Sequence, residues 1–166
     1  MTFYQGQKLL YSAHGVCEMV GIESRKVDRK MVEFYCLCPV EQKSAMFYIP
    51  VSSQAATNKL HPLMSKDELS SLLASVKGED TPWIADENSR KQHYRELMSG
   101  LDRKAMLCTV GAVLRQKDKQ QALGKKLHLC DENFLRDAQK LIAGEFSLVL
   151  GIPKEDVRQY IQKQME

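Results

Sequence analysis

The chain has 166 residues, of which 43% are hydrophobic and 27% charged, and its formal net charge is +3. This is the composition of an ordinary globular protein, and the length suits one domain or two small ones. No apolar run approaches the roughly 18 residues that would span a bilayer, and residues 1–11 lack the apolar segment of a signal peptide. We therefore expect a cytoplasmic protein without a membrane partner, whose five cysteines are reduced thiols.

Short, closely spaced strands are expected in the first third of the chain. Segments rich in β-branched and aromatic residues are typical of strands, and here turn residues separate them. We predict strands at residues 7–11, 16–23, 31–38 and 45–49, with a hairpin turn at 27–30. Strands this short and this close together favour a small antiparallel barrel. Residues 51–63 are rich in Ser, Ala and Asn and indicate a linker, with one more short strand at 59–64.

The rest of the chain has helical periodicity. Ser65 and Glu68 have the spacing of a capping box, which opens a helix that Gly78 ends. A loop at residues 79–87 holds Trp83, the single tryptophan of the chain. Apolar residues at helical spacing then predict helices at 89–99, 102–120 and 131–150, and a last helix with Pro153 as its first residue.

Positive charge is concentrated in one central segment. Residues 88–128 carry ten Lys and Arg against three Asp and Glu, whereas residues 63–87 carry two against six. Such a field attracts polyanions without specifying which. No helix-turn-helix, zinc-finger or aromatic RNA-binding motif accompanies it, so reading of specific bases is not expected.

A set of short motifs, in order along both halves of the chain, resembles one protein family. Phe3-x-x-Gly6-Gln7-x-Leu9-Leu10-Tyr11 and His14-Gly15-Val16 are similar to the opening of CarD/CdnL proteins and of the polymerase-interacting module in transcription-repair coupling factors. Ser12 stands where the family usually has proline, and Tyr48 where it commonly has a basic residue. The second half adds Arg90-Lys91-Gln92-x-Tyr94 after Trp83, and Gly144-Glu145-Phe146-Ser147 in the longest helix. No helicase follows, which disfavours a coupling factor.

The resemblance implies an α+β architecture in two domains. Residues 1–62 would form a small Tudor-like or SH3-like antiparallel β-barrel that binds the lobe of the RNA polymerase β subunit. Residues 65–166 would form an all-α helical bundle that contacts promoter DNA at the upstream edge of the melted region. In the family a tryptophan wedges into the minor groove there. The implied function is a transcription regulator that stabilises the open promoter complex.

Four residues of the first domain are candidates for binding polymerase. Arg25 matches a family position that contacts the lobe, and a guanidinium suits a carboxylate partner. Tyr48, Ile49 and Pro50 match the end of the family strand nearby, and Tyr48 is expected beside Arg25 on the adjoining strand. The simpler interpretation of Arg25 is an ordinary cation at a hairpin end.

Four residues of the second domain are candidates for binding DNA. A minor-groove wedge needs a flat apolar side chain on a loop, with cations that grip nearby phosphates. Trp83 would be the wedge, and Arg90, Lys91 and Arg95 the cations, since a helix places residues 91 and 95 on one face. The simpler interpretations are a tryptophan that covers the helical core and a solvated basic helix face.

Metal-binding and catalytic interpretations have less support. Cys36 and Cys38 lack the Cys-x-x-Cys spacing of a zinc site, so buried structural thiols are favoured. Glu145, inside an apolar helix, is expected to belong to the fold. There is no phosphate-binding glycine loop and no nucleophile elbow. We therefore expect a protein that is not an enzyme, with no cofactor and no small-molecule substrate.

Two alternatives remain open. In the first, the barrel docks on polymerase while the helical domain recruits another protein rather than DNA. In the second, the protein is an enzyme of unknown class, with a polar pocket that joins His14 or Glu145 to other titratable groups.

Overall fold

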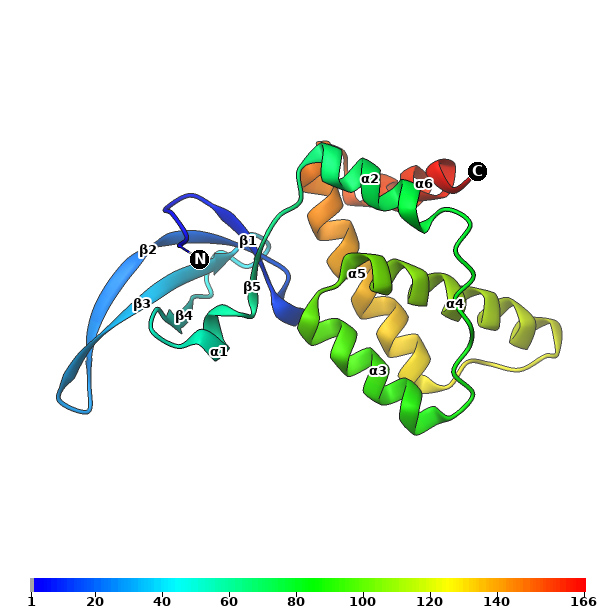
Figure 1. Cartoon of the computed structure of the whole chain (residues 1–166), viewed down its shortest axis with the longest axis horizontal. Helices are drawn as coiled ribbons and strands as arrows, with labels where there is room; N and C mark the ends of the chain where they lie inside the picture. Colours follow the sequence, from blue (N-terminus) through cyan, green and yellow to red (C-terminus); the bar gives the residue numbers. More distant parts are fainter. Residues whose placement is uncertain (1) are drawn as a thin grey trace. The chain divides into compact units, whose positions relative to one another are not determined.

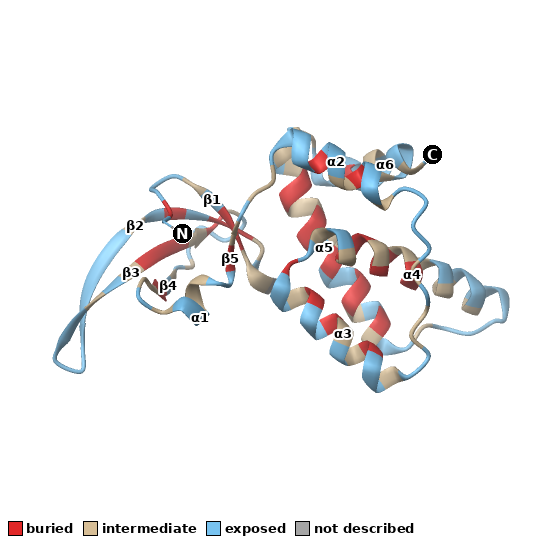
Figure 2. Ribbon diagram, in the orientation of Figure 1, coloured by how far each residue is buried: buried red, intermediate tan, exposed pale blue. Residues whose placement is uncertain are grey.

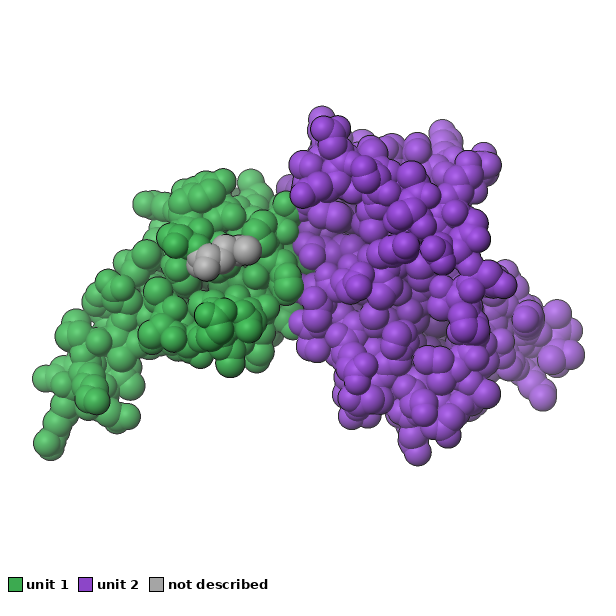
Figure 3. Space-filling view, viewed as in Figure 1, with its two compact units in different colours: residues 1–63 green, residues 64–166 purple. Residues whose placement is uncertain are grey.

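The computed structural model describes residues 2–166. The chain divides into two compact units, residues 1–63 and 64–166 (Figure 3). The domain bounds expected from the sequence are residues 1–62 and 65–166.

The first unit is an antiparallel sheet of five strands (Figure 1). The strands are β1 (Lys8–Tyr11), β2 (Val16–Val27), β3 (Lys30–Pro39), β4 (Phe47–Pro50) and β5 (Leu60–Pro62), in the order β4-β3-β2-β1-β5. Two short helical segments join them, η1 (Ser12–His14) and α1 (Gln54–Thr57). The helix α1 lies where a plain linker was expected, and the Ser53 side chain caps it by accepting from the amide of Ala56.

Strands β2 and β3 form a long hairpin that continues past the other strands (Figure 1). Asp28 and Arg29 make its two-residue loop with φ of 49° and 66°, which is the backbone of a type I′ turn. The turn is where it was predicted, but β2 is longer than the predicted 16–23. The last residues of β2 are mostly polar, and they are exposed (Figure 2). An apolar pattern cannot reveal a strand segment that packs on nothing.

One face of the sheet carries the core of the first unit. Its members come from all five strands and the N-terminal segment, and each is at most 4% exposed: Phe3, Leu9, Cys17, Met19, Tyr35, Leu37, Ile49 and Leu60. Because side chains alternate along a strand, the residues next to these point to the opposite face. In β4 this places Ile49 in the core and leaves Tyr48 exposed.

The second unit consists of five helices. These are α2 (Lys66–Val76), α3 (Glu87–Gly100), α4 (Arg103–Ala122), α5 (Leu129–Leu150) and α6 (Lys154–Met165). The expected class, an antiparallel β unit followed by helices, is confirmed. The capping box of Ser65 and Glu68 is present at the start of α2. Pro153, predicted as the first helical residue of α6, is instead its N-cap.

Helix α5 is the centre of the second unit, because it contacts α2, α3, α4 and α6. Its apolar stripe contains Phe134, Leu135, Ala138, Leu141, Ile142 and Phe146, all buried. Glu145 lies in the same stripe, 1% exposed, with its carboxylate 2.8 Å from Arg103 Nη2. The amide of Met64 donates to the same carboxylate at 3.3 Å. Glu145 therefore links α5 to the N-terminal ends of α2 and α4. This agrees with the expectation that Glu145 has a structural role in the fold.

None of the helices in residues 2–166 combines the length and the apolar character that crossing a membrane requires.

Candidate functional site

The outer face of the first unit carries an exposed cation on an aromatic ring. The guanidinium carbon of Arg25 lies 3.9 Å from the centre of the Tyr48 ring. Its Nε donates to Glu23 Oε1 at 3.1 Å, and both side chains of this ion pair are almost half exposed, 45% and 49%. We call Glu23, Arg25 and Tyr48 the Arg25 patch. The guanidinium lies over the ring and is paired with a carboxylate, and the Arg25 side chain stays exposed enough to meet a partner.

Strand pairing explains how Arg25 and Tyr48 meet. The expectation that they lie on adjoining strands is wrong, because β3 separates β2 from β4. Tyr48 is paired with Cys36, and Arg25 with Val32, so the long arginine side chain reaches diagonally across β3. The thiol of Cys36 lies under this contact and donates to Glu23 Oε2 at 3.7 Å. Burial and the nearby Glu23 carboxylate raise the pKa of Cys36, so it stays a neutral thiol.

Of the two remaining polymerase candidates, Ile49 is corrected as a side-chain contact, whereas the role of Pro50 stays a prediction. The Ile49 side chain is 4% exposed inside the core, so it cannot contact a partner, and its assignment as a side-chain contact is corrected. Pro50 is partly buried and its carbonyl accepts from the Ser53 amide at 3.2 Å. Both residues nevertheless belong to β4, which is an edge of the sheet.

The outer edge of β4 offers backbone groups at Tyr48. The amide of Val51 donates to the carbonyl of Glu33 at 3.0 Å, which makes this a hydrogen-bonded pair. In an antiparallel ladder such pairs alternate with pairs whose backbone groups point away. By this alternation Ile49 bonds to β3, and the N–H and C=O of Tyr48 point outward. An edge of this kind can accept a strand from another protein.

In the second unit, Trp83 lies in the loop between α2 and α3, and it is partly buried. The guanidinium carbon of Arg90 is 4.5 Å from the centre of its ring. Cation–ring contacts of this kind contribute about 0.5–2 kcal/mol, more when water is excluded. The Trp83 ring is therefore supported by the Arg90 guanidinium, which belongs to α3, the helix that follows the loop.

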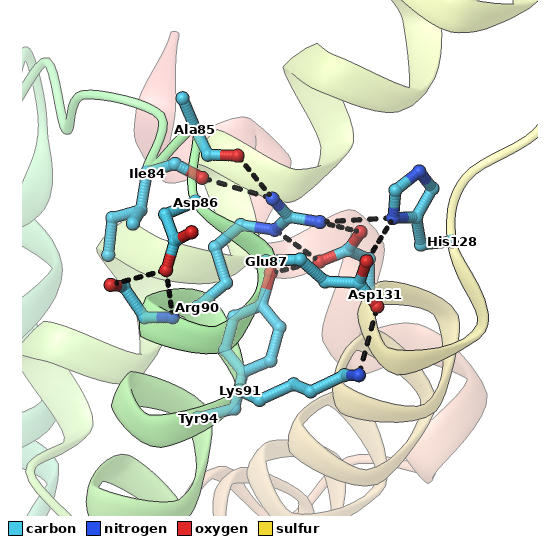
Figure 4. A network of polar contacts seen from close by, with 10 residues as sticks. Ile84, Ala85, Asp86, Glu87, Arg90, Lys91, Tyr94, His128 and Asp131 are labelled. Carbon is cyan, nitrogen blue, oxygen red and sulfur yellow. Dashed lines mark hydrogen bonds and ion pairs between the residues drawn. The ribbon is translucent and has the colours of Figure 1, made fainter.

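Arg90 is held in a network of polar contacts (Figure 4). Its Nε and Nη2 each donate to an oxygen of Asp131 at 3.0 Å, and its Nη1 donates to the carbonyls of Ile84 and Ala85. The hydroxyl of Tyr94 donates to Asp131 Oδ1 at 2.6 Å. Burial first, and then the hydrogen bond to Asp131, raises the pKa of Tyr94 well above its ordinary value, so this hydroxyl remains a donor.

The expectation that Arg90 contacts DNA is therefore corrected. Arg90 is 3% exposed and its charge is paired with Asp131, which is 1% exposed. A guanidinium that is already bonded on three nitrogens inside the domain does not reach a phosphate. Arg90 instead fixes the Trp83 loop, since it bonds the two carbonyls that follow Trp83 and stacks on the ring itself.

Lys91 and Arg95 lie one helical turn apart on α3 and remain at the surface. Lys91 is 41% exposed at its side chain, and its Nζ is 2.9 Å from Glu87 Oε1. This contact raises the pKa of Lys91. Arg95 is exposed. Their role as DNA contacts stays a prediction, as does that of Trp83.

Sequence reasoning missed Asp131, which holds both Arg90 and Tyr94. Asp131 lies in the first turn of α5, where an acidic residue is common because of the helix dipole. The only available signal was the spacing of Arg90 and Tyr94, which puts both on one face of α3. That spacing does not indicate which residue binds the pair, because Asp131 lies 41 residues after Arg90 in the sequence.

The first unit thus combines an exposed patch with an open sheet edge, and the helical unit supports a loop that carries the tryptophan. Residues 3–63 match the family model of the CarD-like/TRCF RID domain, which covers nearly the whole first unit. Residues 3–63 therefore carry a domain of the CarD-like/TRCF RID type, and this match supports a transcription-related protein that interacts with RNA polymerase. The resemblance seen in the sequence is thereby confirmed for residues 3–63, and for the helical unit it stays a prediction. No curated protein matches the chain.

Proposed function

We propose that the protein is a non-catalytic regulator that stabilises the open promoter complex. Its first unit would bind the lobe of the polymerase β subunit, and its second unit would contact DNA at the upstream edge of the melted region. The observation that carries this proposal is the Arg25 patch beside the open edge of β4, within a domain of the polymerase-interacting type.

Docking would combine backbone pairing with side-chain recognition. A strand of the lobe pairs with the outward N–H and C=O of Tyr48, and this pairing gives affinity that depends little on side chains. Arg25 then binds an acidic group of the lobe and selects the partner, because its guanidinium is already oriented by Tyr48 and Glu23. Tyr48, which stands where the family has a basic residue, would thus help to orient Arg25.

Contacts with DNA would be independent of sequence. Trp83 is the flat apolar side chain that can insert at an unstacked base step, and Lys91 and Arg95 on the helix that follows can bind phosphates. Residues 88–128 supply the positive field that brings DNA to this surface. Arg90 contributes by holding the loop of Trp83 rather than by touching DNA.

Stabilising the open complex requires only that the protein binds the melted state more tightly than the closed state. A difference of about 1–3 kcal/mol changes the open population roughly 5- to 150-fold. The direction of the effect on transcription depends on the promoter, because an open complex that is too stable is slow to escape.

The docking step is tested by titrating the full-length protein into the isolated β-lobe fragment of its own polymerase. We expect micromolar or tighter binding that Arg25→Glu weakens at least about tenfold, equivalent to about 1.4 kcal/mol. Lys26→Glu is the matched control, because Lys26 is an exposed neighbour on β2 that points to the opposite face. Equal losses in both variants would show a general charge effect and contradict specific docking through Arg25.

A further inference from the structure

A cavity of about 560 Å³ lies within the helical unit. Its walls are α4 and α6, with α5 between them and the end of α2 at one margin. Both α4 and α6 contact α2 and α5, and side chains of α4 and α6 face the cavity from its two walls. Its volume falls in the range of about 300–1,000 Å³ that is usual for small-molecule sites.

The lining of the cavity is mainly apolar. Most of it comes from three helices, with Leu107 and Leu114 on α4, Ile142 on α5, and Val157, Ile161 and Met165 on α6. The lining residues of α6 recur through nearly its whole length, so the cavity is elongated along that helix. An elongated apolar space suits an extended hydrocarbon chain.

Gly111 keeps the α4 wall open. Glycine in the middle of a helix costs stability relative to alanine, and such a residue often has a packing or functional reason. Here a Cβ atom would meet only Arg115 Nη1, at 3.3 Å, so no backbone forces the residue to be glycine. A side chain at this position would project into the cavity instead. The sequence thus leaves unfilled a space that a leucine would occupy.

Cations outnumber acids among the charged residues that line the cavity. Arg115, Lys154 and Arg158 line it, together with Glu79 and Glu166. The excess of cations over acids at an apolar cavity favours a ligand with one anionic group and one apolar chain.

We propose that this cavity is a binding site for an amphipathic anion, with its hydrocarbon chain between α4 and α6 and its carboxylate or phosphate at Arg115 and Arg158. A ligand bound in the cavity can affect the loop of Trp83 through Arg115. Arg115 Nη2 donates to the carbonyl of Thr81 at 3.2 Å, two residues before Trp83. An anion that binds Arg115 competes for this donor, so the emission of the single tryptophan reports occupancy.

The test is calorimetric titration of the full chain with three probes that share a dodecyl chain, kept below their micelle concentrations. These are dodecanoate, dodecyl phosphate and the cationic dodecyltrimethylammonium. We expect saturable binding of one or both anions, at least about tenfold tighter than the cation. Preference for one anion identifies the headgroup that the site recognises.

Two variants locate the site. Gly111→Leu fills the cavity and should weaken binding of the anion at least about tenfold, while its thermal midpoint stays at or above that of the wild type. Gly100→Leu is its control, since Gly100 is an exposed helical glycine outside the cavity. Arg158→Glu should weaken binding at least about fivefold, and Arg136→Glu, an exposed arginine of α5 outside the cavity, should not.

The proposal is overturned if neither anion binds saturably, or if the cation binds as tightly as the anions. It is equally overturned if folded Gly111→Leu protein binds the anion as the wild type does.

Discussion

Removing Asp131 should destabilise the helical unit strongly, because Asp131 is the only carboxylate bonded to the Arg90 guanidinium among the described residues. In Asp131→Ala, Arg90 keeps its burial and its charge but loses both charge-assisted bonds. Breaking a buried ion pair by removing one partner costs about 3–5 kcal/mol. A small protein has about 5–15 kcal/mol of stability in total, so this loss is a large part of it. The Tyr94 hydroxyl loses its acceptor in the same variant.

The assay is urea denaturation followed by circular dichroism, with the emission of Trp83 as a second probe. We expect Asp131→Ala to unfold at much lower urea and its folded state to show a red-shifted emission, because Arg90 no longer holds the Trp83 loop. The exposed pair of Arg136 and Asp137 provides the control, with side chains 68% and 52% exposed. Asp137→Ala should change stability by about 0–1 kcal/mol.

A double variant separates the buried charge from the packing. In Arg90→Met/Asp131→Leu both charges are gone, and replacing a buried pair by apolar residues is often neutral. We expect most of the stability to return while the Trp83 emission stays red-shifted, since the carbonyls of Ile84 and Ala85 have lost their donor. A loss below about 1 kcal/mol in Asp131→Ala would refute the view that this pair anchors the loop.

Three further predictions concern local features. Arg29→Gly should stabilise the protein by about 1 kcal/mol in thermal or urea denaturation, because Arg29 has a φ of 66° that glycine adopts without strain; a loss of stability would contradict the assigned turn. Ser65→Ala should cost about 0.5–2 kcal/mol, since it removes the capping box of α2, and no change in the urea midpoint would contradict the cap. Hydrogen bonds from Ser89 lower the pKa of Asp86. The stability this gives is present above the unfolded pKa of about 3.9 and is lost as pH falls through the folded pKa, so the advantage of wild type over Asp86→Asn should disappear in acid.

Elements with a local cause could be predicted from the sequence. The capping box, the hairpin turn and the apolar stripe of α5 each depend on residues a few positions apart, and all three are present. Errors arose where a segment carries no apolar pattern or periodicity. The end of β2 was missed because its residues pack on nothing, and α1 because a four-residue helix has no periodicity to detect.

In the candidate site, too, features with a local signal in the sequence could be predicted and features that depend on distant residues could not. That Trp83 precedes a basic helix is visible in the sequence, but the burial of Arg90 is not, because it depends on Asp131, 41 residues away. A basic residue in a basic segment looks like a surface cation until its partner is known. Likewise the contact of Arg25 with Tyr48 required the strand order, since it crosses β3. The family of the first unit was visible in the sequence because short motifs carry the resemblance, and the family model matches residues 3–63.

The central claim is that polymerase docking and the Trp83 surface act together to prolong the open promoter complex. Its most direct test is the lifetime of open complexes, formed by the organism's own polymerase and challenged with a competitor, with and without the full-length protein. We predict a roughly 5- to 150-fold longer lifetime with wild type, loss of the effect with Arg25→Glu through loss of docking, and loss with Trp83→Ala although polymerase binding is retained. An unchanged lifetime with wild-type protein bound to polymerase would contradict the account.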